Sequence, residues 1–153
     1  MLDTVATLND IATFQYSVLK NLLKDATAEE LDWKIHPEAV SSRWIIGHLG
    51  WFEDYISDAI ENTGLYQAAK GRQSYAFDNL DQFLAKVDKA RDRRLALYED
   101  LRKEDLERKI LLVGEYDIPI RILIRVHAEH FSGHVHQIQL IRGTYNRAYG
   151  NDK

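Results

Sequence analysis

Apolar side chains recur every three or four residues in four long segments of the chain, a spacing that predicts amphipathic helices. The first segment runs from about Leu2 to Asp25. Its predicted core face consists of Leu8, Ile11, Val18 and Leu22, with the polar Gln15 in the same stripe.

A short helix and a second long helix are expected next. The sequence "TAEE" is typical of a capping box, in which Thr27 accepts from the third amide and Glu30 reaches back. Pro37 should end this short helix, because proline disfavours helical dihedrals in the residue before it. The second long helix begins after Ser41 or the serine next to it, and Gly64 should end it. Its aromatic face consists of Trp44, His48, Trp51 and Tyr55.

A third helix is predicted from Asp78, which can cap it, to about Leu101. Its apolar face consists of Phe83, Val87, Ala90, Leu97 and Leu101, with Arg94 in the middle. Because a guanidinium keeps its charge, Arg94 must pair with an acid, reach solvent or meet an anionic ligand. Pairing with Asp or Glu is the favoured interpretation.

The fourth segment, which begins with "IPIRILIRV", allows two interpretations. Its alternating β-branched residues are typical of a strand. A helical stripe also runs without interruption from Ile120 through His127, His130 and His134 to Ile141, and Gly143 should close it. We favour the helix, because one element then explains about 24 residues. A short extended segment in "KILLVGEYDI" just before it remains open.

The four amphipathic segments predict an all-α fold, a four-helix bundle, with residues 1–153 as a single domain. The connections between the helices run to roughly 14 to 17 residues, longer than the 2 to 8 usual in bundles. Long connections permit crossovers, so a simple up-and-down topology is not required.

Composition and charge narrow the range of possible partners, locations and metal ligands. Apolar residues make up 45% and charged residues 29%, as in an ordinary globular protein, and the formal net charge of -4 predicts no nucleic-acid partner. No apolar run is long enough for a membrane span and the first residues lack a secretory pattern, so we expect no membrane association and a cytoplasmic location. The chain has no cysteine, so nitrogen and oxygen must hold any metal.

Histidine is the candidate metal ligand, since "HAEHFSGHVHQ" holds four of the six histidines. On a helix His130 and His134 lie about 40° apart and one turn along, so both imidazoles can reach one point. His48, on the aromatic face of the second helix, supplies a third nitrogen if the two helices are neighbours. His136 lies about 160° from His134 and is excluded. The competing interpretation is that these histidines are core residues bonded to backbone carbonyls.

Two stretches carry a resemblance to a known family. "SSRWIIGHLGWFEDY" resembles the second-helix signature of the DinB-like superfamily, the damage-inducible proteins and bacillithiol transferases also called DinB/YfiT-like, and "HFSGHVHQI" is similar to its fourth-helix pattern. The resemblance implies a bundle with crossover connections, commonly a homodimer, that holds one divalent metal by His48, His130 and His134. Zinc, nickel and ferrous iron all suit three imidazoles.

An open three-histidine site and the resemblance lead to a first hypothesis, a metal-dependent S-transferase that joins a small-molecule thiol to an electrophile. Gln137 is then the candidate for orienting water or substrate, and Tyr55 and Arg94 are weaker candidates for the catalytic pocket. A metal-dependent hydrolase is the alternative, although Glu53 lies well over about 100° round its helix from His48. A third alternative is a non-enzymatic stress-response module stabilised by its metal.

Overall fold

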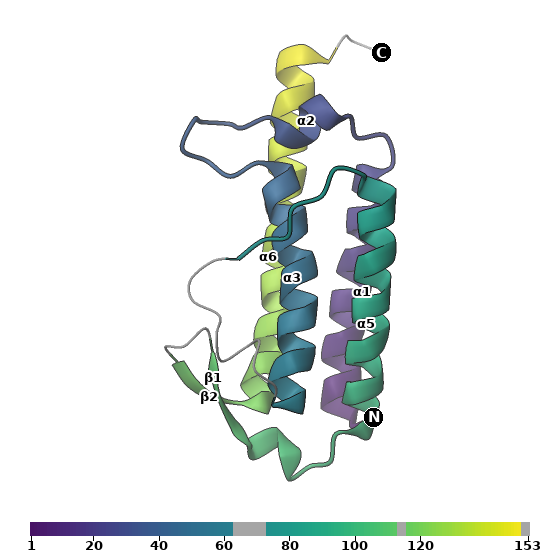
Figure 1. The fold of residues 1–153 in the computed structure, drawn as a ribbon, viewed down its shortest axis with the longest axis vertical. Helices are drawn as coiled ribbons and strands as arrows, with labels where there is room; N and C mark the ends of the chain where they lie inside the picture. Colours follow the sequence, from purple (N-terminus) through teal and green to yellow (C-terminus); the bar gives the residue numbers. More distant parts are fainter. Residues whose placement is uncertain (63–72, 113–115, 151–153) are drawn as a thin grey trace.

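Four long helices lie side by side in the computed structural model, which describes residues 1–62, 73–112 and 116–150 (Figure 1). They are α1 (Asp3–Leu23), α3 (Ser42–Glu61), α5 (Leu80–Asp100) and α6 (Ile120–Tyr149). Helices α1 and α6 run from the lower to the upper end of Figure 1, whereas α3 and α5 run the other way. The neighbours α1 and α6 are therefore parallel, as are α3 and α5, while α3 and α6 are antiparallel.

Of the three connections, only the one from α3 to α5 joins two parallel helices, so the chain must return along the bundle there. The predicted four-helix bundle with crossovers is confirmed. Helix α2 (Ala28–Asp32) lies in the first connection at the upper end, and the 3₁₀ helix η1 (Asp105–Glu107) lies in the last connection at the lower end (Figure 1). No helix among the described residues is both long and apolar enough to cross a membrane.

The helix starts follow the predicted capping chemistry in two of three cases. Thr27 accepts from the backbone N–H of Glu30 at 3.2 Å, and Ser41 accepts from that of Trp44 at 3.3 Å. The cap of α5 is Asn79, one residue after the predicted Asp78. The second half of the capping box was wrong as well, because the Glu30 carboxylate pairs with Arg142 on α6 instead of reaching back.

Three helix ends differ from the prediction. Helix α2 ends at Asp32, before Pro37, because the backbone is already extended at the next residue. Helix α3 ends at Glu61, where Asn62 takes the left-handed conformation at φ 62°; the expected terminator, Gly64, lies outside the described residues. Helix α6 continues through Gly143 for six further residues to Tyr149, since a helical glycine costs only about 1 kcal/mol relative to alanine.

Both the helix and the short extended segment expected around "IPIRILIRV" are present. Strands β1 (Lys109–Leu112) and β2 (Tyr116–Pro119) form an antiparallel pair with Ile110 opposite Ile118. Helix α6 starts at the next residue, Ile120, so the hairpin leads directly into the helix that carries most of the histidines.

The predicted core face of α1 was wrong in part: Leu8, Val18 and Leu22 pack against the core but are only half-buried. Ile11 is 44% exposed, and the buried residues are Val5, Asn9, Ala12, Tyr16, Leu19 and Leu23, one position further along the chain. Asn9 and Tyr16 carry polar atoms and Ala12 is small, so this face shows a weaker apolar pattern than the one beside it. Both polar side chains contact α5 inside the bundle.

Candidate metal centre

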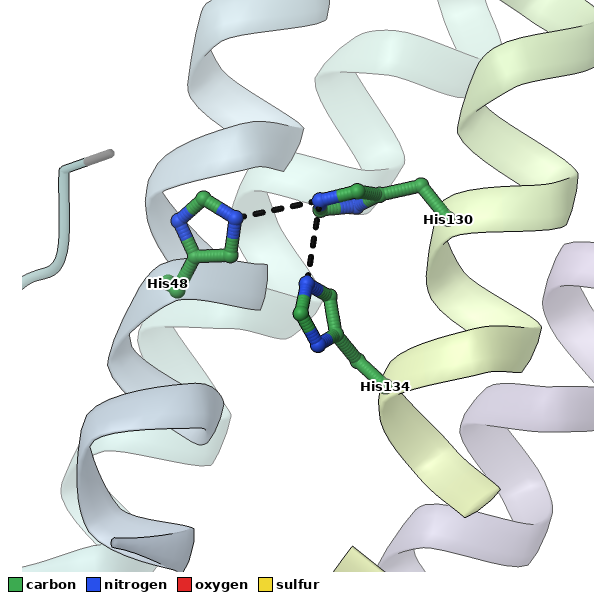
Figure 2. A group of neighbouring side chains, drawn as sticks. All are labelled: His48, His130 and His134. Carbon is green, nitrogen blue, oxygen red and sulfur yellow. Dashed lines mark hydrogen bonds between the residues drawn. The ribbon is translucent and has the colours of Figure 1, made fainter. Parts of the chain in front are cut away.

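Three imidazoles converge between α3 and α6 (Figure 2). The Nε2 atom of His130 lies 3.0 Å from that of His48 and 3.1 Å from that of His134. One ligand atom from each of the three lies within 4.8 Å of the other two. His48 is buried, and the two histidines of α6 are half-buried. The structure thus brings together the three residues that the sequence singled out.

Helix geometry accounts for the convergence. His130 and His134 are one turn apart on the same face of α6, and His48 faces them from the antiparallel helix α3. Both helices are long and packed in the core, so the site rests on rigid elements.

Each outer histidine is oriented by a bond from its other ring nitrogen. Nδ1 of His134 lies 2.7 Å from Oε1 of Gln137, and Nδ1 of His48 is hydrogen-bonded to the backbone oxygen of Gln73. Both partners are carbonyl oxygens and can only accept, so each Nδ1 carries the proton and each Nε2 presents a lone pair to the centre. Partners of this kind fix the tautomer and raise the basicity of metal-ligating histidines.

The donor set fits a divalent cation. The Nε2 atoms of His48 and His134 both face that of His130, so lone pairs from the three rings can be directed at one point. A positive ion among the three nitrogens satisfies all of them. Nitrogen ligands of a tetrahedral zinc ion, at about 2.0–2.1 Å from the metal, are about 3.3 Å apart. The separations of 3.0 and 3.1 Å to His130 lie close to this value, and all three ligand atoms lie within 4.8 Å of one another.

Aromatic rings surround His48 and His130. Trp44 and Trp51 stack on His48 with ring centroids 5.1 and 5.9 Å away, and Phe52 lies 4.2 Å from the ring of His130. This wall limits water on one side of the centre and lowers the local dielectric, which strengthens electrostatic interactions there. The aromatic stripe predicted around His48 is thus part of the site.

A glycine of α3 that sequence reasoning passed over brings the Gln73 carbonyl to His48. A Cβ atom at Gly47 would lie 2.1 Å from the backbone oxygen of Tyr75. The missing side chain lets the connection to α5 lie against α3, where Tyr75 N–H donates to the Gly47 carbonyl at 3.2 Å. A glycine inside an otherwise strong helical pattern was the available signal.

The other predicted site residues lie in different places. Gln137 is beside the centre and holds His134. Tyr55 is fully buried, its ring against Trp51, and lies roughly 10 Å of helix rise beyond His48. Arg94 is 1% exposed and forms an ion pair with Glu53 at 2.6 Å. The favoured interpretation, that Arg94 pairs with an acidic residue, is confirmed.

Glu53 is the centre of a buried ionic cluster that sequence reasoning missed. Its carboxylate accepts from Arg94 at 2.6 Å and from Arg91 at 2.9 Å, and lies 3.2 Å from Nε2 of His127. Arg94 also donates to Asn9 at 2.8 Å. The cluster therefore joins all four long helices, and the only signal for it was the need of Arg94 for an acidic partner.

Charge and burial oppose each other in this cluster. Burial alone would raise the pKa of the Glu53 carboxyl, yet the cationic groups facing it hold that pKa well below its usual range. These groups are His127 in its protonated form, Arg94 and Arg91. Burial lowers the pKa of His127 in spite of the carboxylate beside it, so at neutral pH the two guanidinium groups keep Glu53 ionised.

The remaining histidines stay outside the centre. His127 belongs to the ionic cluster, and His136 is exposed, in agreement with its exclusion. His36 is exposed in the first connection, where its Nδ1 accepts from the backbone N–H of Glu38 at 3.3 Å. Among the described residues, the only group of three or more potential metal ligands is the set of His48, His130 and His134.

Fold and site together define the class of protein: a four-helix bundle with a candidate three-histidine metal centre between two antiparallel helices. The sequence matches the family model of the DinB superfamily over residues 12–138, and the chain belongs to this superfamily. The resemblance found in the two histidine-bearing stretches is thereby confirmed. None of the curated proteins matches the chain.

Solved structures share the fold at low sequence identity. The four-helix bundle protein TT2238 is 17% identical, with a TM-score of 0.71 over 89% of this chain and 98% of its own. A conserved protein from Enterococcus faecalis is 10% identical, with a TM-score of 0.73 over 93% and 96%. The DinB-like protein YjoA from Bacillus subtilis is 15% identical, with a TM-score of 0.69 over 96% and 94%.

Proposed function

We propose that the protein is a divalent-metal-dependent thiol S-transferase, which joins a low-molecular-weight thiol to an electrophilic carbon. The observation that carries the proposal is the convergence of three Nε2 atoms, two of them on rings oriented by a bond at Nδ1, with no carboxylate or fourth imidazole in the group among the described residues. Three protein ligands leave coordination positions for exogenous groups, which is typical of catalytic rather than structural metal sites.

The side chains have distinct tasks. His48, His130 and His134 would hold the ion, which supplies the Lewis acidity that lowers the pKa of a thiol. Gln137 keeps His134 in the tautomer that presents Nε2, and Trp44 shields the ring of His48. The protein has no thiol of its own to compete with the substrate.

The reaction balances without an oxidant or reductant. The thiol gives its proton to solvent, and the electron pair of sulfur forms a new carbon–sulfur bond. The leaving group, chloride for example, departs with the electron pair of the broken carbon–halogen bond.

Conjugation is the direct test. Purified protein loaded with zinc, nickel or ferrous iron, with the stoichiometry measured by elemental analysis, is incubated with bacillithiol, mycothiol or glutathione plus chlorodinitrobenzene. We expect conjugation above background with at least one thiol, and loss of both metal and activity in the His130→Ala/His134→Ala variant. The matched control is His136→Ala, an exposed histidine of the same helix. No conjugation with any of the three thiols would refute the proposal.

The same samples separate the two alternatives. A hydrolase needs a base at the centre, but Glu53 is held by two arginines and Asp54 accepts from the hydroxyl of Tyr75 at 2.9 Å. For a metal-stabilised module, chelation would lower the melting temperature while no thiol altered the absorption spectrum of the cobalt-substituted protein. A thiol-dependent change in that spectrum is expected of a transferase.

A further inference from the structure

A cavity of about 220 Å³ adjoins the candidate metal centre. His134 and Gln137 line it on one side, so it opens onto the face of α6 that carries the metal-centre histidines. Trp44, whose ring stacks on His48, lines it from α3. The cavity therefore adjoins the candidate centre and shares His134 with it.

Apart from His134 and Gln137, the lining is apolar. Val40 and Leu140 are 36% and 60% exposed at its edge, and Ile45 forms part of its wall. None of the described residues that line it is an acid, a lysine or an arginine. Apolar groups that gather around one opening, with one amide among them, are typical of a small-molecule site.

We propose that this cavity, the apolar chamber, binds an uncharged aromatic or branched alkyl part of the electrophilic substrate. The inference rests on the proposed function, because it assigns the second substrate of the same site. Cysteine-derived thiols carry carboxylate and amino groups, whose lost hydration an apolar wall does not replace. The thiol therefore reaches the centre from another direction, and the uncharged partner takes the chamber.

Size and polarity define the substrate further. The volume of about 220 Å³ is below the roughly 300–1,000 Å³ of pockets for drug-sized ligands, so the chamber suits a single ring or a short branched chain. The Gln137 oxygen is used by His134, which leaves its amino group as a donor on the wall. A nitro, carbonyl or similar acceptor beside the reacting carbon would meet that donor.

Equilibrium binding tests the chamber independently of catalysis. The unreactive probe para-nitrobenzyl alcohol is titrated into the full chain, both chelator-treated and zinc-loaded, and followed by quenching of tryptophan fluorescence. We expect saturable binding in both samples. In the chelator-treated sample, where no metal can bind a carboxylate, the matched probe para-nitrobenzoate should bind about tenfold more weakly or worse, because its carboxylate loses hydration against an apolar wall.

Two exposed positions provide matched variants. Leu140→Lys places a charge at the edge of the chamber and should weaken binding of para-nitrobenzyl alcohol by about tenfold. Ile11→Lys changes an exposed isoleucine of α1 outside the chamber and should leave binding unchanged. Equal affinity for the two probes, equal effects of the two variants, or no saturable binding would overturn the inference.

Failure of the inference and failure of the proposed function give different results. If the neutral probe binds as expected but no thiol is conjugated, the chamber stands and the transferase is refuted. If thiols are conjugated while Leu140→Lys changes neither probe binding nor the KM for chlorodinitrobenzene, the transferase stands and the chamber is refuted.

Discussion

Replacement of Glu53 by alanine should strongly destabilise the fold. The Glu53 carboxylate is fully buried, and Arg94 beside it is 1% exposed and Arg91 8% exposed. The substitution would leave two guanidinium groups facing each other with no carboxylate between them. Removal of one partner from a buried ion pair typically costs about 3–5 kcal/mol. Because folded domains are stable by only about 5–15 kcal/mol, this is a large part of the total.

Urea unfolding of the metal-free protein, followed by circular dichroism, measures the loss. The matched control is Glu107→Ala, which removes the carboxylate of a surface pair with Arg121 at 2.9 Å. Both partners of that pair are at least half exposed, so the expected loss is about 0–1 kcal/mol. The dependence of the unfolding free energy on urea should stay the same, so that midpoints can be compared directly.

A small effect at Glu53 would contradict the reasoning. If Glu53→Ala and Glu107→Ala lost the same stability to within about 1 kcal/mol, the guanidinium groups of the cluster would have to reach water without the carboxylate. The buried ionic cluster would then have no special part in joining the helices.

Three further predictions concern the metal centre and pH. Gly47→Ala should lower zinc affinity about 10–100-fold, because the new Cβ displaces the carbonyl partner of His48. The control is Gly133→Ala, whose new Cβ meets no atom within 4 Å and should leave zinc affinity unchanged. Equal zinc affinities for the two variants, measured by competition with a chelator, would contradict this prediction. Gln137→Ala should weaken zinc binding by a similar factor, about 10–100-fold, with the exposed Gln139→Ala as control. Since the folded pKa of Glu53 is depressed, its stabilisation is complete above the ordinary carboxyl pKa of about 4.3 and is lost as pH falls through the folded value. The difference in unfolding free energy between metal-free wild type and Glu53→Gln should therefore shrink on acidification below about pH 4. A constant difference would show that the Glu53 carboxyl is not the group whose protonation lowers the stability.

Local periodicity was enough to predict the histidine pair on α6. The spacing of His130 and His134 fixes their common face in any helix, and the apolar residues around them place that face inside the bundle. The partnership with His48 required the packing of two helices that are far apart in the sequence. The resemblance to the DinB-like superfamily indicated this partnership, which periodicity alone did not.

The ionic cluster could not be predicted in the same way. Glu53 is buried because Arg91 and Arg94 meet it from another helix, and nothing near it in the sequence indicates this. The face of α1 was misjudged for a related reason. Asn9 is a polar residue that becomes buried by bonding to Arg94, so hydrophobicity favoured the wrong neighbouring stripe.

Predictions of helix ends were wrong where tertiary packing outweighed a local sequence signal. Gly143 is a reasonable terminator by propensity, but α6 continues past it to the aromatic contact of Tyr145 with Trp33 beside α2, at a centroid distance of 5.7 Å. The bidentate pair of Arg142 with Glu30 joins the same two elements. Contacts made by the last turns therefore stabilise a helix that its sequence alone would end earlier.

The register of α3 against α6 connects the ionic cluster to the metal centre. Because the two helices are antiparallel, a step forward along α3 corresponds to a step back along α6, and His48 is level with the turn between His130 and His134. Five residues further along α3 is Glu53, and the position level with it on α6 is His127, which it contacts at 3.2 Å. Two cross-links, roughly 7 Å apart along the axis, thus fix both the sliding and the rotation of α6 relative to α3. Three nitrogens that must share one ion do not tolerate a slide of a fraction of a turn, so the contact of Glu53 with His127 helps to hold the register that the metal centre requires.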